Sequence, residues 1–194
     1  MHRHALIASE QTEVEGLPVT TLVRTVADLL LSLPRNPAAV AVESLVFERR
    51  LTLDEVADLP LLVRGRHGVS RAIPTLQSIR PGAESPLETL SRLRFSDLGL
   101  EASVIQPVIV DAQGAFLGRA DLGFGGVPPV ILGEADGVAV HEGRQMRAHD
   151  ARREERLRLA GHEVVRWTWD ELVSDAPAIV ARIRAFAAKH RIEL

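Results

Sequence analysis

Three acidic residues near the middle of the chain have the types and spacing of a metal-binding cluster. Glu134 and Asp136 stand at the end of an apolar run that begins at Val127. A short apolar run bounded by glycine is typical of a buried strand, in which residues two apart point to the same face. Asp121 lies in a second strand candidate, residues 116–124, which a Gly-Gly turn joins to the first. We expect the three carboxylates to converge if these strands pair as a hairpin.

Such a cluster favours a divalent cation, because neighbouring carboxylates resist joint ionisation. Hard oxygen ligands suit Mg²⁺, or Mn²⁺ in its place. Simpler explanations stay open for each acid. An acid at a strand end can cap the next element or pair with an arginine, and Asp136-Gly137 is a common turn signal.

The elements that would position this cluster lie in the second half of the chain. Ser85-Pro86-Leu87-Glu88 is typical of a helix start, with serine as the cap, proline at the first position and Glu88 at the third. Glu88 is therefore a candidate for a capping box as well as for the acidic cluster. The further elements that we expect are strands 102–110, 116–124 and 127–136, helix 144–160, strand 162–169 and helix 170–189. Trp167 and Trp169 would then share one face of the last strand, and we expect both in the core.

The first 80 residues predict a mostly helical region. Apolar residues recur at helical spacing from Leu22 to Leu33, with Thr20 or Thr21 as the cap. Further helices are expected from Pro37 to Arg49, from Thr52 to about Pro60, and from Ser70 to Ile79 with Pro74 in the first turn. Residues 14–20 are expected to form a short strand or an extended lead. We place the N-terminal region at 1–80, a boundary at Arg80–Ala83, and a second domain at 84–194.

The composition of the 194-residue chain argues against several classes of protein. It contains no cysteine, so disulfide frameworks and thiolate zinc sites are excluded. Aromatic residues make up 4% with no tyrosine, which disfavours a stacking platform for single strands. No signal-peptide pattern and no run of about 18 apolar residues is seen, so we expect no membrane partner and a cytoplasmic location.

Arginines are concentrated in the expected helix 144–160 and near the acidic cluster. Contact with the phosphates of double-stranded DNA is one interpretation. The other is a solvated helix face, since Asp150, Glu154 and Glu155 interleave with the arginines and can pair with them. Arg166, on a core strand, is placed to neutralise the carboxylates or to contact phosphate. The candidate DNA-binding residues are Arg119, Arg144, Arg147, Arg153 and Arg166.

The order of these pieces resembles the PD-(D/E)XK nuclease superfamily, and more specifically its branch related to very-short-patch mismatch-repair endonucleases, represented in many actinobacterial chains. Ser85–Glu88 looks like the family's first helix with its acidic residue. Gly118-Arg-Ala-Asp121-Leu is similar to its "G-x-x-D-h" strand. Glu134-Ala-Asp136-Gly137 followed by His141 resembles "E-x-D-G-x-x-x-H". Asp150 to Arg166 resembles "D-x-x-R-x-x-x-L-x-x-x-G-x-x-V-x-R", and the whole likeness covers about residues 84–172.

The resemblance implies an α/β fold class with a restriction-endonuclease-like core (α-β-β-β-α-β-α, a mixed sheet flanked by helices). It also implies Mg²⁺-dependent hydrolysis of DNA phosphodiesters, with Asp121 and Glu134 as metal ligands and Asp136 nearby. Glu88 would hold a water or a second metal, and His141 would act as general base or acid. The superfamily's usual lysine is replaced by Asp136, so a non-catalytic DNA- or protein-binding module of antitoxin or regulatory type is the alternative.

A second resemblance lies in the first half. Gly16 to Leu29 is similar to the "G-h-P-V-T-x-x-x-R-T-h-x-D-L" segment of the same actinobacterial chains, which are related to abortive-infection antitoxins. Longer relatives usually carry an N-terminal winged helix, and this chain is expected to be a short or truncated member without it. A homodimer, and a partner toxin or repair protein, are open expectations.

Overall fold

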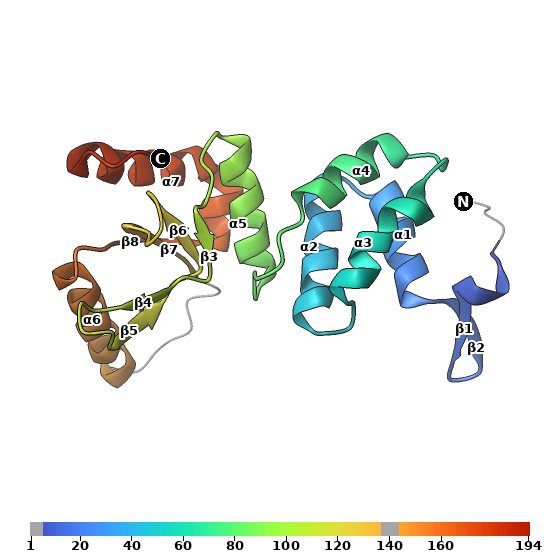
Figure 1. Cartoon of the computed structure of the whole chain (residues 1–194), viewed down its shortest axis with the longest axis horizontal. Coiled ribbons are helices and arrows are strands. Elements are labelled where there is room, and N and C mark those ends of the chain that lie inside the picture. Colours follow the sequence, from blue (N-terminus) through green and yellow to red (C-terminus); the bar gives the residue numbers. More distant parts are fainter. Residues whose placement is uncertain (1–5, 137–143) are drawn as a thin grey trace. The chain divides into compact units, whose positions relative to one another are not determined.

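The computed structural model describes residues 6–136 and 144–194, and the side chains of residues 6–136 and 150–194. The chain divides into two compact units, Met1–Pro81 and Gly82–Leu194 (Figure 1). The division falls inside the stretch expected as the boundary. Among the described helices, none has the length and apolar character that crossing a bilayer requires.

The first unit is a group of four helices preceded by a β-hairpin. Its elements are the 3-10 turn Ala8–Glu10, β1 Gln11–Val14, β2 Leu17–Thr20, α1 Leu22–Ser32, α2 Arg35–Phe47, α3 Leu53–Val63 and α4 Val69–Ser78. The helices pack around buried Val26, Leu30, Val42, Leu59 and Val63.

The caps of this unit agree with the sequence, but two proline positions do not. Thr21 caps α1, and Thr52 forms a capping box with Glu55 at the start of α3. The prediction that α3 ends near Pro60 was wrong, because the helix continues to Val63. Pro74 lies in the interior of α4 rather than in its first turn. Buried residues on both sides of Pro60, Leu59 and Val63, hold the helix in spite of the missing N–H.

The second unit is a mixed α/β domain. Its elements are α5 Pro86–Asp97, β3 Val104–Ile105, β4 Val108–Val110, β5 Phe116–Arg119, β6 Leu122–Phe124, β7 Ile131–Asp136, α6 Arg144–Leu159, β8 Glu163–Thr168 and α7 Trp169–His190. The main sheet has the order β3-β6-β7-β8, antiparallel except for the parallel pair β7–β8. The strands β4 and β5 form a separate antiparallel ribbon.

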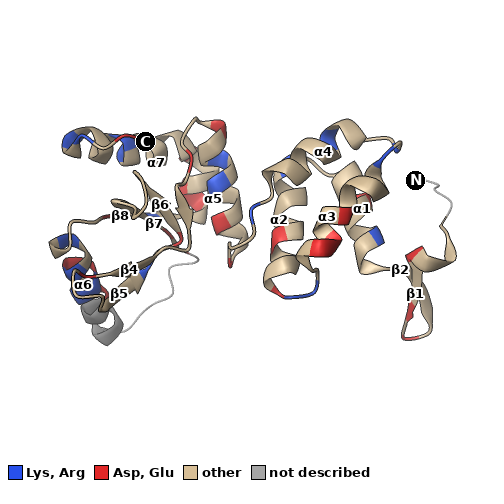
Figure 2. Ribbon diagram, in the orientation of Figure 1, with Lys and Arg blue, Asp and Glu red and all other residues tan. Residues whose placement is uncertain are grey.

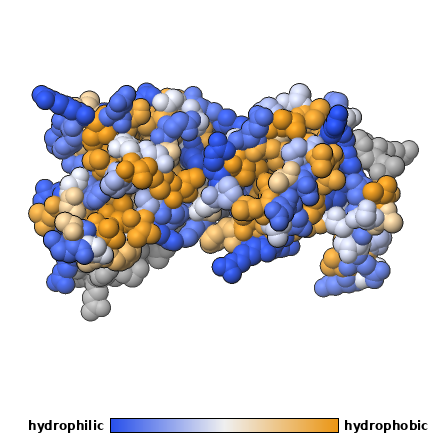
Figure 3. Space-filling view, in the orientation of Figure 1, coloured by the Kyte–Doolittle hydropathy of each residue, from blue (hydrophilic) through white to orange (hydrophobic). Residues whose placement is uncertain are grey.

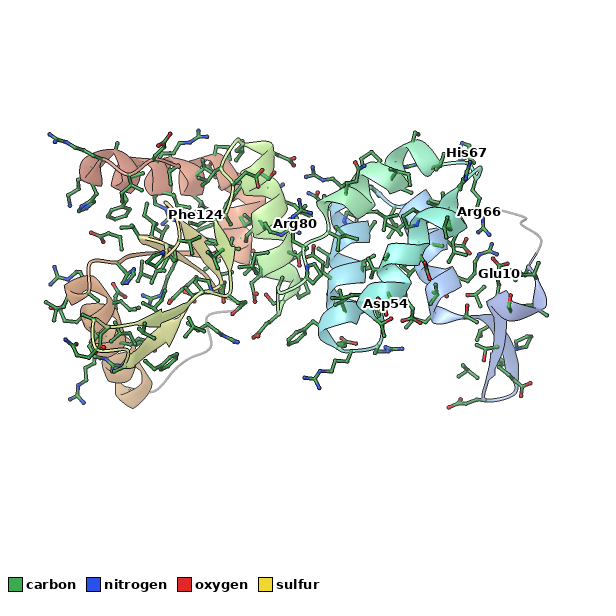
Figure 4. All side chains as sticks on the ribbon, in the orientation of Figure 1. Glu10, Asp54, Arg66, His67, Arg80 and Phe124 are labelled. Atoms are coloured by element: carbon green, nitrogen blue, oxygen red, sulfur yellow. The ribbon has the colours of Figure 1, made fainter. Side chains whose placement is uncertain are left out.

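Helices cover both faces of the main sheet. On one face, Phe124, Ile131 and Trp167 pack with the buried residues of α5 and α7 (Phe124 is labelled in Figure 4). On the other face, Leu132 and Val164 pack with Leu157 of α6 and with residues of the β4–β5 ribbon. Side chains alternate along β7, so Glu134 lies on the same face as Leu132, towards α6.

The packing around Trp167 requires a glycine in the neighbouring strand. A Cβ at Gly133 would lie 2.6 Å from the Trp167 ring. The ring also makes an edge contact with Phe95, and its Nε1–H donates to Ser91 Oγ at 2.7 Å. Trp169 is 46% exposed as the first residue of α7, so the expectation that both tryptophans share the core was wrong. The strand ends at Thr168, which caps α7.

Two expected strands are each split in two. Residues 102–110 form β3 and β4, separated at Gln106-Pro107, and residues 116–124 form β5 and β6, separated at Ala120-Asp121. The first break leads the chain from the main sheet to the ribbon, and the second leads it back to the main sheet. The outer face of this ribbon is apolar, with Val108, Val110 and Phe116 exposed, and Figure 3 shows apolar surface over the unit.

Candidate functional site

The central acidic residue, Asp121, is attached directly to the strand that carries Glu134. It stands just before β6, where Leu122 pairs with Gly133 of β7. The Asp121 N–H donates to the Gly133 carbonyl at 3.0 Å, and Asp121 Oδ2 accepts from the Ala135 N–H at 2.7 Å. Asp121 therefore contacts the peptide groups on both sides of Glu134, which places the two acidic residues next to each other.

A third acid, Glu88, reaches the same place from α5. The amide nitrogen of Gln106 donates to Glu88 Oε2 at 2.7 Å and lies 3.4 Å from Asp121 Oδ1. Glu88 Oε2 also accepts from the Glu84 N–H at 2.8 Å. Ser85 caps α5 as expected, by accepting from the Glu88 N–H. The carboxylate of Glu88 does not complete a capping box with Ser85 and is shared between Glu84 and Gln106 instead.

The pKa of Asp121 is raised above its ordinary value. Burial raises the pKa of Asp121 to about 6, in opposition to the hydrogen bond from Ala135, and the charges of Glu88 and Glu134 add to the rise. Like charges close together disfavour the ionised form, so Glu88 and Glu134 raise the pKa of Asp121 in the same direction as burial, which is the larger cause.

Glu134 is also paired with two arginines. Its side chain is largely buried; Arg166 Nε donates to Oε2 at 2.8 Å, and Arg153 Nη1 lies 2.7 Å from Oε1. Glu134 and Arg166 are direct neighbours in the parallel register of β7 and β8. Arg166 contacts Glu154 of α6 as well, at 2.5 Å. Burial lowers the pKa of Arg166, but the bonds and charges of Glu154 and Glu134 outweigh it and raise the pKa above its ordinary value.

A glycine provides the space for Arg153. The guanidinium crosses β5 over Gly118, where a Cβ would lie 2.8 Å from Arg153 Nε. Arg153 Nη2 also donates to the Arg119 carbonyl at 2.7 Å. The pairing of Glu134 with Arg153 thus ties α6 to the edge of the site.

The residues around Asp121 can be tested for fit to a divalent cation. No group of three His, Asp or Glu side chains in the described part of the chain is already arranged as a metal site. Among the described residues, two buried side-chain oxygens lack a hydrogen bond, Gln106 Oε1 and Glu134 Oε1. Glu134 Oε1 lies 2.7 Å from Arg153 Nη1 as an ion pair, without the alignment of a hydrogen bond. Asp121 Oδ1 and Glu134 Oε1 are hard donors of the type that Mg²⁺ prefers, so these carboxylates fit such an ion chemically, and Gln106 Oε1 is a further buried acceptor beside them.

The other predicted site residues are placed as follows. Asp136 is exposed at the end of β7. Arg119 forms a two-pronged ion pair with Glu84, at 2.8 and 2.6 Å. His141 lies outside the described residues. Arg144 and Arg147 lie in α6, but their side chains lie outside the described part. Figure 2 shows basic and acidic residues interleaved along α6.

Two residues that contact the site were not predicted from the sequence. They are Gln106, which contacts Glu88 and Asp121, and Glu154, which pairs with Arg166. The signal for Gln106 was present: a polar residue interrupts the apolar run 102–110 and precedes a proline. Glu154 was assigned only to a solvated face of its helix. No sequence pattern marks which acid on that helix meets a strand arginine.

Arg24 and Asp28, which lie in the segment of the second resemblance, belong to a separate ion-pair network in the first unit. Arg24 is 2% exposed; its Nη1 lies 2.6 Å from Glu10, and its Nε lies 3.0 Å from Asp28. Arg66 contacts the same two acids, at 3.1 and 3.5 Å. Figure 4 labels Glu10 and Arg66 at one end of this unit, together with His67. The network joins the 3-10 turn that precedes the hairpin to α1 and to the loop between α3 and α4.

Comparisons with known proteins find no protein-family model, no curated protein and no solved structure that matches this chain.

Proposed function

We propose that this protein is a Mg²⁺-dependent DNA endonuclease of the PD-(D/E)XK type. The observation that carries the proposal is the placement of Asp121 against the peptide groups on both sides of Glu134, with Glu88 joined to Asp121 through Gln106. The order of elements from α5 to α7 supports it, since it follows the α-β-β-β-α-β-α order of a restriction-endonuclease-like core with two strands interrupted.

Asp121, Glu134 and Glu88 would hold the ion. When bound, Mg²⁺ would supply an acidified water and stabilise charge on the phosphate. Asp121 becomes a full anionic ligand only above its pKa of about 6, so cation binding is expected to strengthen as the pH rises through that value. Glu134 would offer an oxygen only by loosening its contact with Arg153.

The arginines would then serve the substrate. Arg153 and Arg166 bring two positive charges to the side of the site that faces α6. A guanidinium released from Glu134 is suited to a phosphate oxygen, because its planar donors match phosphate geometry. Arg119 is a further phosphate contact if it leaves Glu84. Double-stranded DNA is therefore the proposed substrate.

One observation favours a second function, a non-catalytic DNA- or protein-binding module on the same fold. Glu134 is already neutralised by Arg153 and Arg166. A carboxylate satisfied in this way has less need of a metal, and the usual lysine of the superfamily is missing. In this alternative the arginines hold α6 to the sheet, and DNA or protein binds without being cut.

A plasmid-nicking assay separates the two functions. The wild-type protein is incubated with supercoiled DNA and Mg²⁺ or Mn²⁺, beside Asp121→Ala and a matched control, Asp170→Ala. Asp170 is an exposed carboxylate in the same unit. The nuclease proposal expects nicking by wild type and Asp170→Ala and a loss of at least about 100-fold for Asp121→Ala. Equal cutting by all three proteins, or no cutting while DNA is still bound, would contradict it.

A further inference from the structure

Gln106 has an unusual backbone conformation at the point where β3 ends and β4 begins. Its φ is +52°, in the left-handed region, and Pro107 follows it. Residues other than glycine, asparagine and aspartate rarely adopt this conformation, which costs on the order of 1 kcal/mol. The backbone is fixed there on both sides: the Gln106 N–H donates to the Asp121 carbonyl, and the Ala120 N–H donates to the Pro107 carbonyl. The strained turn delivers the Gln106 side chain to the acidic cluster.

The chemistry of the neighbours dictates how the Gln106 amide is oriented. Glu88 and Asp121 are acceptors when ionised, so the amide nitrogen must face them, at 2.7 and 3.4 Å. The amide oxygen then points elsewhere, and among the described residues nothing donates to it although it is buried. A buried oxygen without a donor costs about 1–3 kcal/mol. A strained backbone and an unsatisfied oxygen both reduce stability, so a glutamine with a purely structural role would not be expected to combine them.

We propose that Gln106 is a positioning residue of the cation site. Its amide nitrogen holds Glu88 and Asp121 side by side against their mutual repulsion. Its buried oxygen is the acceptor for a water that enters with the ion, since Mg²⁺ usually keeps several of its waters. This inference rests on the proposed function, because it assumes that the acidic cluster binds a divalent cation.

The proposal is tested by Mn²⁺ binding to the full-length protein, measured by calorimetry at pH 7.5. Gln106→Asn keeps the amide and tolerates the positive φ, but it is one methylene too short to reach both carboxylates. Gln106→Met keeps the length and loses the donor. We expect both variants to bind Mn²⁺ about 10- to 100-fold more weakly than wild type, as for other residues that orient metal ligands. The matched control is Gln113→Met, at an exposed glutamine in the β4–β5 turn.

A second readout separates positioning from folding. The midpoint of thermal unfolding without metal is expected to stay within a few degrees of wild type for Gln106→Asn, while the rise caused by Mn²⁺ shrinks. If Gln106→Met does not fold, Gln106→Asn decides the question. Wild-type affinity in Gln106→Asn would overturn the role of Gln106 and leave the cation site intact. Failure of the wild type to bind millimolar Mn²⁺ would overturn the proposed function and this inference together.

Discussion

Asp121 makes hydrogen bonds to the peptide groups on both sides of Glu134. Its N–H donates to the Gly133 carbonyl, and its carboxylate accepts from the Ala135 N–H. The arrangement forces two carboxylates into proximity, and Glu88 adds a third. The ionised form of Asp121 is disfavoured in the folded protein, by burial first and then by the charges of Glu88 and Glu134. The effect of the ionised Asp121 carboxylate on stability is therefore the first property to measure.

Replacing Asp121 by asparagine should change how stability depends on pH. The pKa of Asp121 in the folded protein, about 6, lies above its ordinary value of 3.8, so its contribution to stability is full below about pH 4. That contribution is lost as the pH rises through 6. We expect the free energy of unfolding of wild type to fall by roughly 1 kcal/mol relative to Asp121→Asn between pH 4 and 7, after allowance for solvent screening. Urea titrations at several pH values measure this, and parallel curves would contradict it.

Removing Arg153 should destabilise the protein more than removing its neighbour. Arg153→Ala leaves the buried Glu134 with Arg166 as its remaining partner, and we expect a loss of about 1–2 kcal/mol. Arg152→Ala is the matched control, because Arg152 is exposed on the same helix and should cost less than about 0.5 kcal/mol. Equal losses in chemical denaturation would show that the contact of Arg153 with Glu134 adds nothing to stability.

The same substitution at two glycines compares the packing of Trp167 on the main sheet with that of Arg153 on the β4–β5 ribbon. At Gly133 a Cβ would meet the ring of Trp167, which is buried and held by Ser91, so Gly133→Ala should cost about 1–3 kcal/mol. At Gly118 the new methyl meets the flexible guanidinium of Arg153, which can move. Gly118→Ala should therefore cost less than Gly133→Ala. The reverse order in thermal or urea unfolding would refute the packing described for Trp167.

Much of the architecture could be predicted because local signals are strong where the chain starts a helix. Ser85 caps α5, as its spacing to Glu88 indicated, and Thr52 caps α3 at the residue where that helix was expected to begin. Proline was misleading at Pro60, since burial of Leu59 and Val63 outweighs one lost hydrogen bond. Residues 14–20 were expected as one short strand or an extended lead, and the β1–β2 hairpin was not predicted, because Glu15-Gly16 lacks the Asn-Gly or Asp-Gly pair that marks a two-residue turn.

The proximity of Asp121 and Glu134 could be predicted, but the position of Asp136, exposed at the end of β7, and the arginine partners of Glu134 could not. The strand pattern brought Asp121 towards Glu134, because strand alternation and a short hairpin fix which residues share a face. The pairing of Glu134 with Arg153 depends on how α6 packs on the sheet, which no local pattern encodes. Gln106 is visible in the sequence as a polar interruption of an apolar run, but its contacts with Glu88 and Asp121 depend on a positive φ that no local pattern encodes.

The ion-pair network of the first unit gives a prediction independent of the acidic cluster. Arg24 is buried with Glu10 and Asp28, so Arg24→Ala leaves acids without their main partner and should cost about 3 kcal/mol. Arg64→Ala, at an exposed arginine of the same unit, is expected to change stability by less than about 0.5 kcal/mol. Circular dichroism during urea unfolding reports both. A loss below 1 kcal/mol for Arg24→Ala would mean that the network is dispensable.

The most direct test of the central claim is a crystal structure of the wild-type protein soaked in Mn²⁺, with anomalous difference density to locate the ion. The acidic cluster predicts a peak in contact with Asp121 and at least one of Glu88 and Glu134. No peak at Asp121 under saturating Mn²⁺, with Glu134 still paired to both Arg153 and Arg166, would contradict metal-dependent hydrolysis.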